Sequence, residues 1–87
     1  MTYRIELAPS ARRDFKKFAP GTILKRLRDA IDNLASDPRP EGVKKLIDAD
    51  DLWRIRVGDY RIVYSINDGE LLVLVVQLGH RRDISKN

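Results

Sequence analysis

Residues 52–66 are typical of a β-hairpin, and this hairpin constrains the fold more than any other stretch of the chain. Gly58-Asp59 is the predicted turn, because the first central position of such a two-residue loop needs a positive φ, which glycine adopts without a Cβ clash. The turn sets the register, and side chains alternate between the two faces of the sheet. The residues predicted to share one face as core are Trp53, Ile55, Val57, Tyr60, Ile62 and Tyr64.

The other face of the hairpin carries three arginines. Arg56 falls opposite Arg61, and Arg54 lies diagonal to that pair. Like charges directly opposite each other on a sheet are unfavourable by up to about 1 kcal/mol, so stability does not explain the cluster. One interpretation is a solvated face whose side chains splay apart. The other is an anion site, since arginine remains charged and forms forked hydrogen bonds to phosphate.

The composition excludes several classes of site. A chain of 87 residues predicts a single domain over residues 1–87 with a thin core. Absence of cysteine excludes disulfides, thiolate metal sites and cysteine nucleophiles. One histidine and scattered carboxylates predict no metal, and no cofactor is expected. Without a signal peptide or a run of about 20 apolar residues, we expect a cytoplasmic protein with no membrane partner. The net charge of +4 favours anionic partners.

The first part of the chain predicts a strand followed by two helices. Residues 3–7 alternate apolar and polar side chains, as a strand does. Ser10 is the predicted N-cap of the first helix, which ends at Pro20. Thr22 is the predicted cap of the second helix, and an apolar stripe at helical spacing continues this helix to Asp37. Together the two helices predict a helical hairpin.

The second part predicts a meander of strands. Residues 37–51 are rich in proline and charge and indicate a connecting loop. Asp68-Gly69 predicts a second tight turn after the hairpin. Residues 71–78 are apolar without alternation, which predicts a central strand with the first strand beside it. The expected order is β-α-α-β-β-β, an α+β fold in which the helical hairpin packs on one face of an antiparallel meander.

Two further groups of basic residues lie outside the hairpin. Lys44 and Lys45 precede Leu46 in the connecting loop, either as surface lysines or as part of a basic site. The last predicted strand ends in His80-Arg81-Arg82. Arg81 would join the arginine cluster if the strand end lies next to the basic face, and a frayed basic tail is the other reading. His80 is the one side chain whose ordinary pKa lies near neutrality.

Together these segments resemble the RelE/ParE superfamily of bacterial and archaeal type II toxins. The resemblance covers nearly the whole chain and rests on the helical pair, residues 44–46, residues 52–64 and residues 79–84. It implies a RelE-like fold and a toxin that a cognate antitoxin neutralises. For the RelE branch it implies an mRNA interferase, an endoribonuclease that cleaves mRNA on the ribosome without a metal.

The resemblance also implies roles for individual residues. The arginines at positions that would hold and neutralise the scissile phosphate are Arg54, Arg56, Arg61 and Arg81. The residues expected to bind RNA beside them are Lys44, Lys45 and Arg82. A cationic cluster suits attack of a ribose 2′-hydroxyl on the neighbouring phosphate, because negative charge on the pentacoordinate phosphorus is what needs stabilising.

Ser85 departs from the family pattern, which has a tyrosine at this position. A serine is a poor proton acceptor, and loss of a general base costs about 10²- to 10⁴-fold in rate. The substitution therefore predicts attenuated cleavage, unless His80 serves as the base.

Two alternatives to the nuclease remain open. A ParE-type toxin shares the fold and inhibits DNA gyrase by binding, without ribonuclease activity. An inactive module that only binds antitoxin is the third reading. Three arginines on one sheet face favour the nuclease, whereas Ser85 favours the alternatives.

Overall fold

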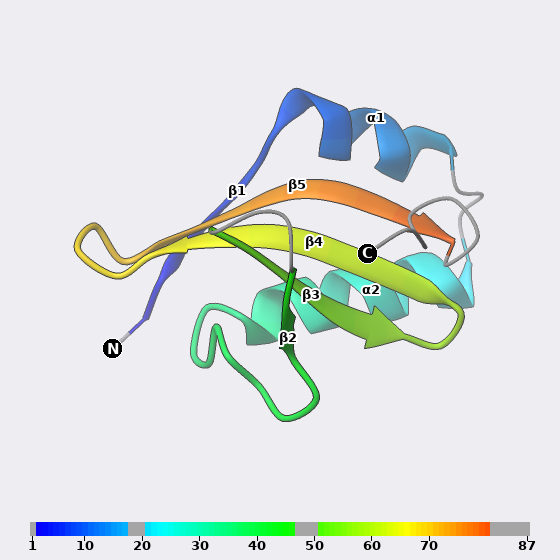
Figure 1. Ribbon diagram of the computed structural model, residues 1–87. Helices are drawn as coiled ribbons and strands as arrows, with labels where there is room; N and C mark the ends of the chain where they lie inside the picture. The colour runs from blue at the N-terminus through cyan, green and yellow to red at the C-terminus, as the bar shows by residue number, and fades with distance from the viewer. Residues whose placement is uncertain (1, 18–20, 47–50, 81–87) are drawn as a thin grey trace.

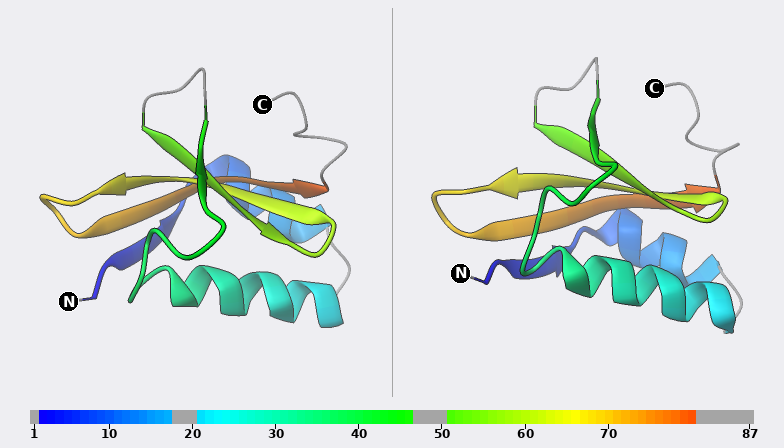
Figure 2. Two further views of the ribbon diagram at one scale, coloured as in Figure 1. Left: turned by 60° about the horizontal axis from the view of Figure 1, so that its bottom comes forward. Right: turned by 90° about the horizontal axis from the view of Figure 1, so that it is seen from below.

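A five-stranded sheet with two helices on one face forms the protein (Figures 1 and 2). The computed structural model describes residues 2–17, 21–46 and 51–80. The elements in chain order are β1 (Arg4–Leu7), α1 (Pro9–Lys17), α2 (Thr22–Asn33), β2 (Lys44–Lys45), β3 (Leu52–Val57), β4 (Tyr60–Asn67) and β5 (Leu72–His80). This arrangement confirms the predicted α+β class and helical pair. No helix in these ranges is long and apolar enough to span a membrane.

The β3–β4 hairpin has the register that the sequence predicts. Gly58 adopts a φ of 60° in the turn. The facing pairs are Trp53 with Tyr64, Ile55 with Ile62, Arg56 with Arg61, and Val57 with Tyr60. Because one side of this ladder is apolar and the other basic, the register assigns the apolar residues to the face that the helices cover.

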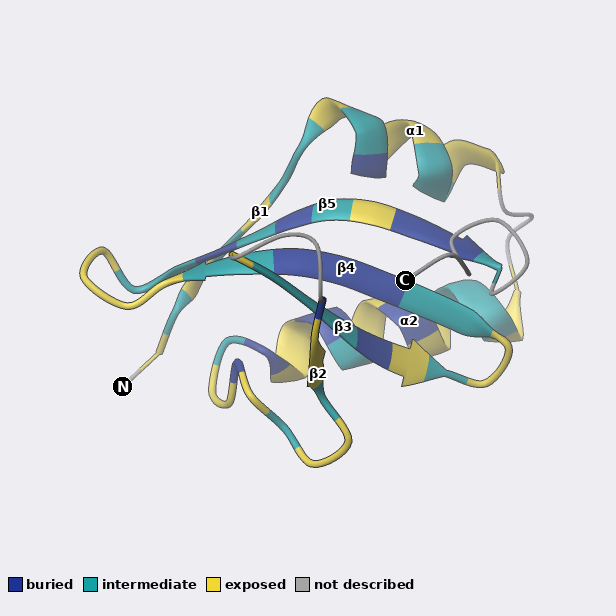
Figure 3. Ribbon diagram, viewed as in Figure 1, coloured by how far each residue is buried: buried dark blue, intermediate teal, exposed yellow. Residues whose placement is uncertain are grey.

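The core lies between this face and the helices (Figure 3). Ile62 and Tyr64 of β4 are fully buried, and Leu27 and Ile31 of α2 belong to the same cluster. Trp53, although predicted to be core, is only half-buried at the edge of this cluster. The predicted core is therefore confirmed at its centre and thins toward the ends of the hairpin.

The sheet differs from the expected meander at its two edges. The strand order is β1-β5-β4-β3-β2. β3, β4 and β5 form the predicted antiparallel meander, and β1 pairs with β5 as expected, but in parallel. β2 is an additional strand of two residues, paired antiparallel with β3. The chain thus builds a mixed sheet, with the long apolar strand β5 inside it.

The helix boundaries require three corrections. Ser10 is not the N-cap of α1, because Pro9 is the first helical residue, a position that its fixed φ suits. Gly21 rather than Thr22 caps α2. The second helix ends at Asn33, before the predicted Asp37. Just beyond Asn33 the chain contacts the segment before β1, because the Tyr3 amide donates a hydrogen bond to the Ala35 carbonyl (2.7 Å).

Beyond the end of β1, side chains of α1 form hydrogen bonds with the backbone of β5. The last β1–β5 pair is Leu7 with Val75. The Ser10 hydroxyl then donates a hydrogen bond to the Val76 carbonyl (2.6 Å), and the Leu78 amide donates one to the Asp14 carboxylate (2.9 Å). These bonds fix α1 along β5.

An open groove of about 730 Å³ lies between α1 and α2. The residues that line it include Ile5, Leu7, Phe15, Leu24 and Ile31.

A buried tyrosine joins the loop after α2 to the sheet. The fully buried Tyr64 donates a hydrogen bond to the Pro38 carbonyl (2.7 Å). Burial raises the pKa of the Tyr64 hydroxyl above its ordinary value, so this group remains a neutral donor.

Tyr64→Phe should lower the free energy of unfolding by about 1 to 3 kcal/mol, because the buried Pro38 carbonyl then lacks a partner. Urea denaturation measures the change. The matched control is Tyr3→Phe, which removes the hydroxyl bond to the exposed Asp68 and should cost less. Equal losses in the two variants would contradict a structural role for the buried bond.

A cationic cluster on the open face of the sheet

Four basic side chains meet on the sheet face opposite the helices, and we call them the cationic cluster: Lys44, Arg54, Arg56 and Arg61. They come from three adjacent strands, β2, β3 and β4. Lys44 lies opposite Arg54, and Arg56 lies opposite Arg61. The alternation that buries Ile55 and Ile62 on one face therefore brings these cations together on the other.

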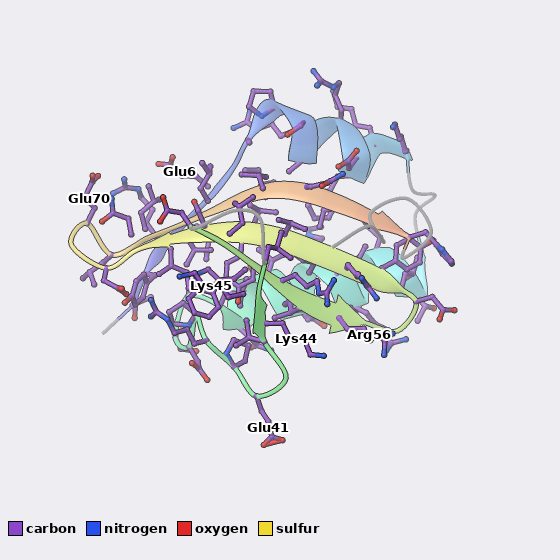
Figure 4. The ribbon with its side chains drawn as sticks, in the orientation of Figure 1. Glu6, Glu41, Lys44, Lys45, Arg56 and Glu70 are labelled. Atoms are coloured by element: carbon purple, nitrogen blue, oxygen red, sulfur yellow. The ribbon has the colours of Figure 1, made fainter. Side chains whose placement is uncertain are left out.

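The cluster surrounds a small cavity. Its volume is about 160 Å³, and Gly42 completes the lining. This volume is below the roughly 300 to 1,000 Å³ of pockets for drug-sized ligands, so it suits an ion-sized group such as a phosphate rather than a whole nucleotide. Figure 4 shows the Lys44 and Arg56 side chains reaching out beside each other from β2 and β3.

The electrostatics of the cavity favour an anion. Every charged residue in its lining is a cation. Arg54 and Arg61 are half-buried, whereas Lys44 and Arg56 are exposed. Half-burial on a rigid strand limits the motion of a guanidinium, and partial exclusion of water strengthens its attraction for an anion. The arrangement can hold a phosphate and stabilise negative charge that develops on it.

His80 is not brought into the cationic cluster. It lies opposite Tyr60 in the β4–β5 ladder, and the two rings make an edge contact with centroids 5.4 Å apart. Tyr60 packs against the core cluster on the helix side. Arg61 instead lies opposite Gly79, so His80 and Arg61 belong to opposite faces of the sheet.

The remaining predicted site residues divide into two groups. Arg81, Arg82 and Ser85 lie outside the described residues. Lys45 is described, but it projects away from Lys44, to the opposite side of β2 (Figure 4). Its ammonium lies over the Trp53 ring, 5.8 Å from the centroid. Within residues 2–17, 21–46 and 51–80 no group of His, Asp and Glu could hold a metal ion.

Sequence reasoning missed the way in which Lys44 reaches the cluster. Two paired residues are too few to show alternation, so β2 was included in a connecting loop. Gly42 was missed for a similar reason, since its place in the lining depends on the fold of that loop. The one available signal was the pair of lysines directly before an apolar anchor, Leu46.

A second charged group, on the helix side of the hairpin, was also missed. Arg39 donates two hydrogen bonds to Asp68, at 3.2 and 2.9 Å, and its guanidinium carbon lies 5.1 Å from the Trp53 ring centroid. Tyr3 donates a further hydrogen bond to Asp68 (2.5 Å). The hydrogen bonds from Arg39 and Tyr3 hold the pKa of Asp68 below its ordinary value.

Comparison with known proteins assigns the chain to a family. The family described as "ParE toxin of type II toxin-antitoxin system, parDE" matches residues 5–85. Toxin RelG of Mycobacterium tuberculosis is 29% identical over 97% of this chain and 97% of its own length.

Solved structures share the fold. The archaeal RelE-RelB complex from Pyrococcus horikoshii OT3 contains a chain with a TM-score of 0.79 and 30% identity, covering 93% of this chain and 97% of that one. The toxin-antitoxin complex RelBE2 of Mycobacterium tuberculosis contains one with a TM-score of 0.82 and 28% identity, covering 93% of each chain. With 81 consecutive positions of the chain matched by the family, residues 5–85, this protein is a RelE-like member of the RelE/ParE superfamily of type II toxins.

Proposed function

We propose that this toxin is a RelE-type mRNA interferase that cleaves mRNA bound to the ribosome, with residues 1–87 acting as one domain in the cytoplasm. The observation that carries the proposal is the cationic cluster, in which four cations from three strands line one ion-sized cavity. A surface of this kind matches the charge of a phosphodiester. No cofactor is part of the proposal.

The reaction would be an in-line attack of a ribose 2′-oxygen on the adjacent phosphorus. The bond from phosphorus to the 5′-oxygen breaks, which leaves a 2′,3′-cyclic phosphate and a 5′-hydroxyl. The proton of the 2′-hydroxyl passes to a base, and the departing 5′-oxygen takes up a proton. Arg54, Arg56 and Arg61 would stabilise the added charge on the phosphorane oxygens, as preorganised donors do in other enzymes. Arg81 and Arg82 would extend this surface, and Lys44 would bind the RNA backbone. Lys45, expected from the sequence to bind RNA, lies over the Trp53 ring on the opposite side of β2 and has no part in the proposal.

We propose a cognate antitoxin as the protein partner. Support comes from the relatives solved in complex with RelB and from the net charge of +4, which favours an acidic partner segment. Such a segment over the cationic cluster would compete with RNA for the same cations.

The second candidate function is a ParE-type toxin that inhibits DNA gyrase by binding. Two observations favour it: the matching family is that of ParE toxins, and Ser85 replaces the tyrosine expected of an RNA-cleaving relative. Under this reading the cationic cluster would serve as a binding surface, without cleavage.

Arg61→Met should slow mRNA cleavage by about 10²- to 10³-fold, the usual cost of removing one preorganised charge-stabilising donor. It also removes the like-charge pair with Arg56, a change that favours the fold by up to about 1 kcal/mol. Primer extension on programmed ribosomes measures cleavage, and thermal denaturation measures stability. The control is Arg4→Met, an exposed arginine paired with Glu6 at 3.0 Å. Gyrase inhibition without any RNA cleavage by the wild-type protein would replace the nuclease by the second candidate.

Ser85→Tyr should raise the cleavage rate by about 10²-fold or more, since it restores a group that can act as a base or stack on a nucleotide. His80→Ala should change the rate little, because the ring contacts Tyr60 on the helix side. A serine protein that cleaves at full rate and loses the activity with His80→Ala would assign the base to histidine instead.

A further inference from the structure

Lys44 is the only member of the cationic cluster that does not belong to the β3–β4 hairpin. It lies in β2, which has two residues and pairs with β3 at the edge of the sheet that the described residues form. Among the residues that the structure describes, two backbone bonds flank β2: the Leu46 amide donates to the Leu52 carbonyl (2.9 Å), and the Val43 amide donates to the Pro40 carbonyl (3.1 Å). A strand of two residues is shorter than the usual length of about 3 to 10, so the contacts of its side chains contribute to its placement beside β3.

One such contact of β2 is that of Lys45 with Trp53 of β3, and Arg39 contacts the same ring. Lys45 pairs in register with Trp53, and both its ammonium and the Arg39 guanidinium lie within 6 Å of the Trp53 ring centroid, at 5.8 and 5.1 Å. Cations at this distance are attracted by an indole ring. Residues 44 and 45 project to opposite faces, so holding Lys45 over the ring sets the direction of Lys44.

Arg39 is itself fixed by the turn between β4 and β5. Both of its bonds to Asp68 are formed through separate guanidinium nitrogens and separate carboxylate oxygens. A bidentate pair of this kind restricts the orientation of the guanidinium plane. Tyr3 donates to the same carboxylate and holds it from the side of β1.

We propose that Asp68, Arg39 and Trp53 are positioning residues that hold β2 against β3 and so keep Lys44 beside Arg54 in the cationic cluster. Asp68 and Arg39 act on the cluster through β2, from the face of the sheet where Lys45 meets Trp53. The functional half of this proposal rests on the proposed RNA-binding role of the cluster. The structural half, that these residues hold β2, does not.

The structural half is tested by amide hydrogen exchange on the full chain with Asp68→Asn. This variant keeps the size of the side chain but loses the charge that orients Arg39. The Leu46 amide, which bonds to Leu52 beside β2, should exchange about tenfold faster, a free-energy change within the range of one cation–π contact. Amides in the centre of β4, such as Ile62, should keep their wild-type rates. An unchanged rate at Leu46 overturns the proposal.

The functional half is tested by binding to a fluorescein-labelled single-stranded RNA at several salt concentrations. Asp68→Asn removes a negative charge, so electrostatics alone would tighten RNA binding. Loss of the Lys44 position instead weakens binding and lowers the salt slope by about one, the change expected when one phosphate contact is lost. Lys44→Met should produce the same change. The double variant should bind no more weakly than Lys44→Met, because both substitutions remove one contact.

The matched control is Glu6→Gln. Glu6 is an exposed carboxylate paired with an arginine at 3.0 Å, with 50% of its side chain exposed against 57% for Asp68. It should leave RNA binding unchanged or slightly tighter. If Asp68→Asn tightens binding as Glu6→Gln does, the positioning role is overturned. If neither the wild-type protein nor Lys44→Met binds RNA, the proposed function fails, and exchange at Leu46 still decides whether these residues hold β2.

Discussion

The tight turn at Gly58-Asp59 is the constraint on which the rest of the molecule depends. A shift of the hairpin by one residue would turn every side chain of one strand to the other face. If that strand were β3, Ile55 would then point to solvent, and Arg54 and Arg56 would point at the helices. Burial of the core and assembly of the cationic cluster are therefore two results of one register.

Most of the sheet was predictable from the sequence because its determinants are local. A glycine turn and alternation over six and eight residues define β3 and β4, and an unbroken apolar run defines β5. β2 lacks such a signal, and its ordering depends on contacts that join residues far apart in the chain. Arg39 and Asp68, for example, are 29 positions apart. The C-terminal end of α2 likewise lies beside a long-range contact, the hydrogen bond from the Tyr3 amide to the Ala35 carbonyl.

The residues of the candidate site could be predicted where the strands that carry them could be predicted. Arg54, Arg56 and Arg61 were identified because the hairpin register places them together. His80 was grouped with them because it follows the predicted strand 71–78, whose end was expected beside the basic face of the hairpin, and because its ordinary pKa lies near neutrality. The position of a residue along a strand does not determine which face of the sheet its side chain occupies, however. Because His80 pairs with Tyr60, the His80 ring lies on the helix side of the sheet. A face can be predicted only when the register across the whole sheet is known.

The hydrogen bonds between α1 and β5 limit where a foreign strand could add to the sheet. β5 has nine residues and β1 only four, so part of β5 would otherwise present unpaired backbone groups, the usual template for adding a foreign strand. Ser10 and Asp14 occupy the Val76 carbonyl and the Leu78 amide with side chains, which propagate no ladder. The most apolar strand is thereby closed to a second molecule at these positions, without the cost of a longer first strand.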